Sequence, residues 1–179
     1  MKGIRRGQFL MSSQTAQSAL LLLKQLKELN KDPHSGFSAG LVDDSNPFEW
    51  QLILTGPPDT LYDGGLFKAR MTFPHEFPFM PPTMRFSSEM WHPNIYPDGR
   101  VCISILHPPG DDPNHYESAM ERWNPVHTVE SILISVISML ASPNDESAAN
   151  LDAAKQWRED PEAFKKKVKQ TVRKAQEEI

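Results

Sequence analysis

The only cysteine of the chain, Cys102, lies in the segment WHPNIYPDGRVCISIL, which covers residues 91–106. A cysteine sulfur can attack a carbonyl group or carry an acyl group, and a nearby hydrogen-bond donor then stabilises the oxyanion that forms. Asn94 is such a donor, and the tight-turn signal Asp98-Gly99 would bring it close to the sulfur. One preplaced N–H group stabilises an oxyanion by about 2.7–4 kcal/mol. The spacing therefore allows acyl transfer on Cys102 with Asn94 beside it.

Each of these residues also has a purely structural interpretation. The neighbours of Cys102 are β-branched residues typical of a buried strand, namely Val101, Ile103 and Ile105. A free cysteine is among the residues most often buried, His92 could lock a turn through a backbone contact, and Pro93 could stiffen that turn. Asn94 could satisfy its own loop. Taken alone, the local pattern favours this structural interpretation.

A cysteine hydrolase is another alternative, because such an enzyme uses a histidine to convert the thiol to thiolate. His107 and His127 are available, but neither lies in a recognisable protease motif. A single cysteine excludes an internal disulfide and, with only scattered histidines, predicts no metal site. It also indicates a reducing compartment, and we expect a cytoplasmic protein.

Hydrophobic periodicity predicts the elements that must position these residues. Apolar residues alternate with polar ones in four predicted strands, at residues 37–42, 48–54, 67–73 and 84–86. Helical spacing predicts helices at residues 16–30, 128–140 and 147–157 and from residue 161 to the C-terminus. Consecutive strands with short connections indicate an antiparallel meander, so the predicted fold class is α+β. Between sheet and central helix, residues 87–127 show little periodicity, which is typical of a functional loop.

Length and charge limit the remaining possibilities. The 179 residues fit one compact domain, which we expect at residues 15–179 after a mobile extension at residues 1–14. The formal net charge of −4 argues against general affinity for nucleic acid. No apolar run approaches the roughly 18 residues needed to span a bilayer, and the basic first residues lack the apolar core of a secretory signal.

The segment HPNIYPDGRVCISIL resembles the active site of ubiquitin-conjugating enzymes, in which Cys follows the His-Pro-Asn motif by eight residues. The resemblance continues through GPPDTLYDGGLF, FPHEFPFMPP and RWNPVHTVESIL, and it covers the chain from about Ala16 to the C-terminus. It implies a ubiquitin-conjugating fold, with an N-terminal helix, a four-stranded antiparallel meander and C-terminal helices. It further implies that Cys102 accepts the C-terminal carboxyl group of ubiquitin as a thioester and passes it to a lysine amine. Asn94 then matches the asparagine credited with steadying the oxyanion or the adjacent loop, and His92 and Pro93 match positions that shape this loop.

The stretch ILHPPGDDPNHYESAMERW resembles one subclass of the family, which carries an acidic loop just after the cysteine and builds polyubiquitin chains that signal degradation. The carboxylates of Asp111, Asp112 and Glu117 should keep the pKa of the Cys102 thiol high and attract an incoming lysine ammonium. We expect Asp111 and Asp112 to orient or deprotonate that lysine. The alternative is a merely solvated loop.

The resemblance also implies partners: ubiquitin, the ubiquitin-activating enzyme, and ubiquitin ligases of the RING type. No cofactor is implied, because the activating enzyme consumes the ATP upstream. Through a partner the protein could also act in the nucleus or at the surface of the endoplasmic reticulum. The residues expected to contact the activating enzyme and ligases are Lys24, Lys27, Phe79, Trp123, Asn124, Pro125 and Val126. Phe77 is expected to pack inward.

Two alternatives remain for a chain of this family. A ubiquitin-binding scaffold without chemistry would share the fold, although such relatives characteristically lack the acceptor cysteine. A ubiquitin-like modifier could also take the place of ubiquitin, but the acidic loop favours ubiquitin.

Overall fold

The computed structural model describes the backbone of residues 4–179 and the side chains of residues 13–179. Four strands form one antiparallel sheet in the order β1-β2-β3-β4. Their bounds are Phe37–Asp43 for β1, Asn46–Thr55 for β2, Leu66–Thr72 for β3 and Thr83–Phe86 for β4. The helices are α1 (Ile4–Leu29), α2 (Val129–Ala141), α3 (Leu151–Glu159) and α4 (Pro161–Glu177). The predicted α+β meander flanked by helices is confirmed.

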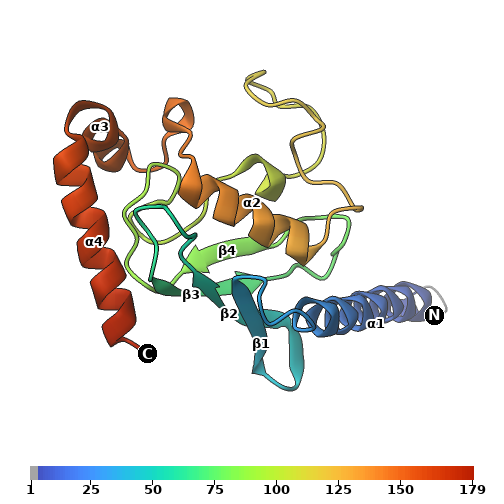
Figure 1. Cartoon of the computed structure of the whole chain (residues 1–179). Coiled ribbons are helices and arrows are strands. Elements are labelled where there is room, and N and C mark those ends of the chain that lie inside the picture. The colour runs from blue at the N-terminus through green and yellow to red at the C-terminus, as the bar shows by residue number, and fades with distance from the viewer. Residues whose placement is uncertain (1–3) are drawn as a thin grey trace.

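The sheet and the central helix form because their apolar residues recur at the period of each element. In β2 the side chains of Trp50, Leu52 and Leu54 are buried while those between them are exposed. Helix α2 lies against the sheet, whereas α3 and α4 stand at one side of it and α1 at the other (Figure 1). Thr128, the first residue of the predicted helix, is the N-cap of α2, since its hydroxyl accepts a hydrogen bond from the Ser131 N–H group.

Two helix starts differ from the prediction. Helix α1 begins at Ile4, before the predicted residue 16, and takes in residues 4–14 of the predicted extension, whereas residues 1–3 lie outside the described part. The apolar stripe marks only the part of a helix that faces a core, and no proline interrupts the chain upstream of it. Helix α3 begins at Leu151 because Asn150, whose side chain accepts from the Ala153 N–H group, is its N-cap. Ser147, at which the predicted helix began, instead ends a short 3-10 turn.

The aperiodic stretch between β4 and α2 is held by turns and isolated contacts. Its regular parts are two β-bridges and one 3-10 turn, Ser104–Leu106. Residues 107–122 form the loop that projects at the top of Figure 1, and we call this segment the acidic loop. None of the helices within residues 4–179 combines the length and apolar content needed to cross a membrane.

Candidate active site

A tight turn brings Cys102 beside Asn94, as the Asp98-Gly99 signal predicted. Gly99 has φ +94°, and a Cβ atom there would lie 2.2 Å from the Phe86 carbonyl oxygen, so only glycine fits. The turn is closed by a bridge between Ile95 and Val101. The Cys102 N–H group donates to the Asn94 carbonyl oxygen at 3.0 Å. The turn thus fixes the backbone on both sides of the sulfur.

The Cys102 side chain is half-buried and lines a surface cavity of about 440 Å³. The same cavity is lined by Asn94, His107, Glu117 and Ser147. Burial raises the pKa of the Cys102 thiol above its ordinary value, and the Glu117 carboxylate adds to this, while contacts with Tyr96 and Arg100 oppose the change without reversing it. Cys102 is therefore a reachable but protonated thiol at neutral pH. Burial is the main cause, and of the three carboxylates expected to raise this pKa, Glu117 is the one that contributes.

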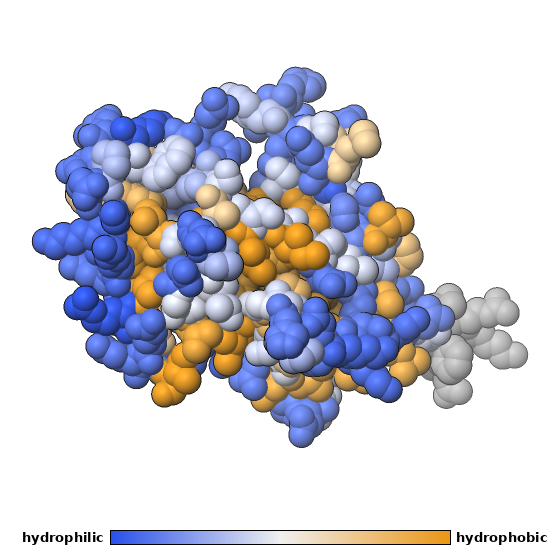
Figure 2. All heavy atoms as spheres, in the orientation of Figure 1, coloured by the Kyte–Doolittle hydropathy of each residue, from blue (hydrophilic) through white to orange (hydrophobic). Residues whose placement is uncertain are grey.

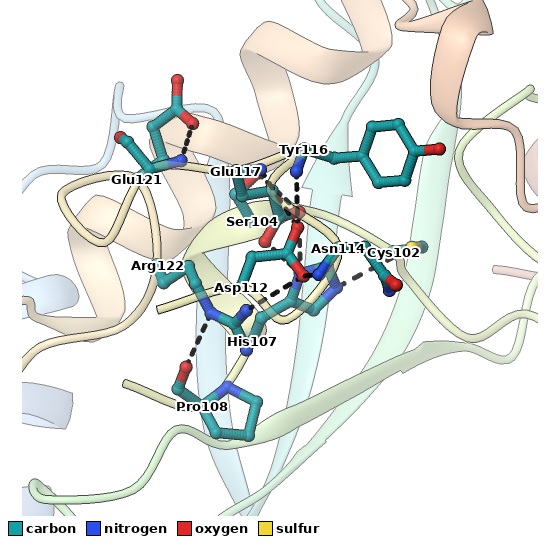
Figure 3. A network of polar contacts seen from close by, with 11 residues as sticks. Cys102, Ser104, His107, Pro108, Asp112, Asn114, Tyr116, Glu117, Glu121 and Arg122 are labelled. Carbon is teal, nitrogen blue, oxygen red and sulfur yellow. Dashed lines mark hydrogen bonds and ion pairs between the residues drawn. The ribbon is translucent and has the colours of Figure 1, made fainter. Parts of the chain in front are cut away.

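A chain of polar contacts leads from the Cys102 sulfur to His107 and then to the Glu117 carboxylate in the acidic loop (Figure 3). The His107 Nε2 atom lies 3.9 Å from the Cys102 sulfur. On its other side, His107 Nδ1 lies 2.8 Å from each carboxylate oxygen of Glu117. The Ser104 hydroxyl also donates to this carboxylate, at 3.1 Å. Sequence reasoning named His107 only as a residue without a protease motif and did not pair it with Glu117.

The Asn94 side-chain amide is fully engaged with the loop that follows α2. Its Nδ2 donates to the carbonyl oxygens of Asn144 at 2.7 Å and Ser147 at 3.2 Å. Its Oδ1 accepts from the Asn144 N–H group at 2.8 Å. This geometry corresponds to an asparagine that steadies a loop beside the sulfur.

His92 and Pro93 hold the backbone around Asn94 in place through buried hydrogen bonds. The buried His92 ring lies 2.8 Å from the Met139 carbonyl oxygen through Nε2, and its Nδ1 accepts from the Asn94 N–H group at 2.9 Å. A carbonyl only accepts and an N–H only donates, so the ring is neutral with its proton on Nε2. The Pro93 carbonyl oxygen accepts from the N–H groups of Ala149 and Asn150. Both residues support the site and do not face the cavity.

The neutral state of His92 predicts an acid-labile fold. Burial lowers the pKa of His92 from 6.5 to about 4, although the Met139 contact opposes this. The unfolded chain therefore binds a proton here at higher pH than the folded chain, and the stability present above pH 6.5 is lost as the pH falls towards 4. We expect a loss of about 3 kcal/mol over this range.

Urea unfolding at a series of pH values, combined with NMR titration of the histidine ring protons, measures this effect. A free energy of unfolding that stays constant over the range would contradict the prediction.

The two aspartates of the acidic loop have different surroundings. Asp112 accepts hydrogen bonds from the N–H groups of Asn114, Tyr116 and Glu117, and it lies 3.8 Å from Arg122. These contacts, led by the bond from Asn114, hold the pKa of the Asp112 carboxyl below its usual range. The Asp111 side chain is exposed. Asp112 thus organises the loop, and only Asp111 is free to meet an incoming group.

The residues predicted to contact partners are exposed or half-buried, except Trp123, for which the prediction is wrong. Phe79 is 57% exposed, Val126 is 82% exposed, and Lys24, Lys27 and Pro125 are also exposed, with Asn124 half-buried beside them. Trp123 is fully buried, because its ring packs near Phe77 and its Nε1 donates to the Pro78 carbonyl oxygen at 2.8 Å. Trp123 thus connects its own loop to the loop that contains Phe77 and Pro78 from inside the protein, and its side chain cannot contact a partner. Phe77 packs inward as predicted.

One face of the molecule is hydrophobic at its centre and hydrophilic around it (Figure 2). Hydrophobic residues gather over the middle of this face, where α2 lies, and hydrophilic residues surround them. Among the described residues, no group of three or more His, Cys, Asp or Glu side chains is placed to hold a metal ion.

Comparison with known proteins gives a consistent result. The family described as "Ubiquitin-conjugating enzyme" matches residues 21–172. Ubiquitin-conjugating enzyme E2 7 of Arabidopsis thaliana is 67% identical over 162 residues, which cover 90% of this chain and 98% of that protein. Ubiquitin-conjugating enzyme E2 G2 of Homo sapiens is 56% identical, with 86% and 93% covered. The solved structure of human ubiquitin-conjugating enzyme E2 G1 superposes with a TM-score of 0.62 at 56% identity and covers 70% of this chain and 96% of that chain.

Proposed function

The chain belongs to the ubiquitin-conjugating enzyme family, and we propose that Cys102 is the residue on which it carries ubiquitin as a thioester. It is a transferase that works with ubiquitin, an activating enzyme and ubiquitin ligases. The observation that carries the assignment is the placement of the only cysteine in a surface cavity at the end of the Asn94 turn. A scaffold without chemistry has no need for a reachable thiol there.

A charging assay tests this proposal. The protein is mixed with ubiquitin, an activating enzyme and ATP, and the products are separated on gels with and without reductant. We expect a band heavier by one ubiquitin that disappears with reductant, because a thiol reductant cleaves a thioester but leaves an amide bond intact. No such band, with folded protein and a control enzyme that charges normally, would favour the scaffold or a different modifier. Release of free ubiquitin from a ubiquitin fusion without a lysine acceptor would instead favour a hydrolase.

We propose that the acidic loop handles the incoming lysine, with different roles for its two aspartates. Asp112 accepts three backbone hydrogen bonds and keeps the loop in shape, and Asp111 presents an exposed carboxylate that attracts the lysine ammonium. In this proposal neither carboxylate needs to be the proton acceptor.

Replacement of these aspartates separates the two roles. We expect Asp112→Ala to slow transfer from the charged enzyme to lysine roughly tenfold, because a displaced loop misplaces the residues around the sulfur. Asp111→Ala should slow it about threefold, since an exposed charge contributes little. Single-turnover discharge of the preformed thioester is the measurement. Normal thioester formation together with normal chain synthesis in the Asp111→Ala, Asp112→Ala double variant would contradict a catalytic role for the loop.

We further propose that the chain builds degradation-signalling polyubiquitin chains with RING-type ligases. The acidic loop after the cysteine supports this subclass, together with the identity to the E2 7 and E2 G2 relatives. A free functional thiol requires a reducing environment, which supports action in the cytoplasm or on its side of the endoplasmic reticulum membrane through a partner.

The partner surface, in this proposal, is formed by Lys24, Lys27, Phe79, Asn124, Pro125 and Val126. Phe79 and Val126 are its exposed apolar members, and binding energy in interfaces concentrates in a few such residues. We expect Phe79→Ala to lower ligase-stimulated discharge about tenfold without changing discharge in the absence of ligase. Leu151→Ala, which removes an exposed apolar side chain at the start of α3, is the matched control. Unchanged ligase stimulation in Phe79→Ala would remove Phe79 from the surface.

A further inference from the structure

The cavity beside Cys102 is also lined by three polar residues that the roles above leave unused, namely Ser104, His107 and Glu117. His107 and Ser104 come from the turn that follows Cys102, and Glu117 comes from the far end of the acidic loop (Figure 3). The distances place His107 between the sulfur, at 3.9 Å from Nε2, and the Glu117 carboxylate, at 2.8 Å from Nδ1. The side chains of His107 and Glu117 are only 33% and 19% exposed.

The carboxylate determines which nitrogen of His107 carries the proton. An ionised carboxylate only accepts hydrogen bonds, so Nδ1 must be the donor in both contacts with Glu117. The neutral ring then has its lone pair on Nε2, which faces the sulfur and the cavity. Glu117 is itself held by the Ser104 hydroxyl and by its own N–H group, which donates to Asp112 at 3.1 Å. The acidic loop thus fixes both the orientation and the tautomer of the imidazole.

We propose that Glu117 is a positioning residue that holds His107 as the proton acceptor for the lysine amine during transfer. This proposal rests on the proposed thioester on Cys102. The lysine nitrogen forms a bond to the thioester carbonyl carbon, the bond between that carbon and Sγ breaks, and Sγ leaves with the electron pair. Before this attack, His107 Nε2 takes one proton from the lysine ammonium and releases it to solvent. The second proton, which the nitrogen loses after the attack, goes to Sγ, so an amide, a free thiol and one released proton remain.

The reaction needs such an acceptor because a free lysine has a pKa near 10.4 and is protonated at neutral pH. Asp112 is poorly suited, since three N–H groups and Arg122 already occupy its carboxylate. The Asn94 side chain is not a suitable acceptor either, because an amide is not a base at neutral pH and both hydrogens of Nδ2 are donated to Asn144 and Ser147. His107 Nε2 lies 3.9 Å from the Cys102 sulfur, and a neutral imidazole can both take and release a proton.

A double-mutant cycle on the preformed thioester tests the proposal. We expect His107→Gln to slow discharge to free lysine about 100-fold, and Glu117→Gln about tenfold, because general base catalysis contributes roughly two to four orders of magnitude. If Glu117 acts through His107, the double variant should be no slower than His107→Gln. Additive losses would overturn the proposal, since they would mean that Glu117 acts on its own.

A second nucleophile separates proton transfer from distortion of the site. Hydroxylamine is unprotonated at neutral pH and needs no acceptor before it attacks, so both variants should discharge to it within about threefold of the wild type. Equal slowing with lysine and with hydroxylamine would overturn the proposal. Glu121→Gln is the matched control, because it removes the same charge from an exposed site on the same loop, where the carboxylate accepts from the Ser118 N–H group. A loss in Glu121→Gln equal to that in Glu117→Gln would also overturn it, by assigning the effect to loop charge.

The yield of thioester shows whether each variant is folded and separates this test from the test of the proposed function. A wild-type protein that forms no thioester contradicts the role of Cys102 before any discharge is measured. A wild-type protein that forms it, with a Glu117→Gln variant that discharges to lysine at the normal rate, contradicts only the role of Glu117.

Discussion

Replacement of Cys102 with serine is expected to abolish transfer of ubiquitin to lysine while leaving the fold intact. Serine has nearly the same shape as cysteine, and the half-buried side chain of Cys102 lines an open cavity, so no void or clash results. An alkoxide is a much poorer leaving group than a thiolate, so any ubiquitin bound through the serine oxygen would remain there. We expect a loss of at least about 1,000-fold in discharge to lysine.

The gel assay makes this prediction sharp because the chain contains one cysteine. A reductant-sensitive band at the mass of this chain plus one ubiquitin must therefore come from Cys102. In Cys102→Ser we expect either no band or a band that resists reductant, and in Cys102→Ala no band at the same position. A reductant-sensitive ubiquitin adduct in either variant would show that the adduct does not contain this enzyme. Thermal unfolding of both variants, compared with the wild type, is the control for folding.

The fold was predictable from the sequence because its elements repeat their apolar residues at regular periods. Alternation in β2 and the helical spacing in α2 each place large side chains on one face, and those faces are the ones that the structure buries. The start of α1 was missed because the residues before the apolar stripe continue the helix without contributing to that pattern. The start of α3 was missed because Ser147 and Asn150 are both acceptable N-caps in sequence, and only tertiary contacts decide between them.

The only part of the site that could be predicted was the part whose backbone is set by the segment from His92 to Cys102. The turn at Gly99 brings Cys102 to Asn94, and the spacing in sequence is enough to expect it. The pairing of His107 with Glu117 was not predictable, because the two residues lie ten positions apart in a loop without periodicity. For the same reason the sequence suggests that the Asp112 carboxylate is free. In the folded loop it accepts hydrogen bonds from three backbone N–H groups of that loop.

Asn94 is the residue at which structure and catalysis are hardest to separate, and its replacement should have the second largest effect. Both directions of its amide are used, with Nδ2 donating to Asn144 and Ser147 and Oδ1 accepting from Asn144. In Asn94→Ala these loop groups lose their partner, and an unsatisfied buried polar group costs about 1–3 kcal/mol. We therefore expect a lower free energy of unfolding and a discharge rate reduced roughly 100-fold, because the oxyanion of the transition state forms beside a loop that is no longer fixed.

Two comparison variants distinguish a loop-steadying asparagine from one that donates directly to the oxyanion. Asn94→Asp keeps the acceptor for the Asn144 N–H group but turns an oxygen towards two carbonyl oxygens, at the positions now 2.7 and 3.2 Å from Nδ2. If the amide acts through the loop, Asn94→Asp should be less stable than Asn94→Ala and discharge at least as slowly. Asn30→Ala is the matched control, because the Asn30 amide also holds a backbone segment, at Ala39, far from the sulfur in sequence.

The measurements are urea unfolding and single-turnover discharge to lysine, made on the same preparations. We expect Asn30→Ala to lose stability and keep its discharge rate, whereas Asn94→Ala should lose both. A variant at position 94 that retains wild-type stability but still discharges 100-fold more slowly would contradict the loop role. In that case the contacts of Asn94 with Asn144 and Ser147 would have to break in the transition state, so that the amide could turn towards the oxyanion.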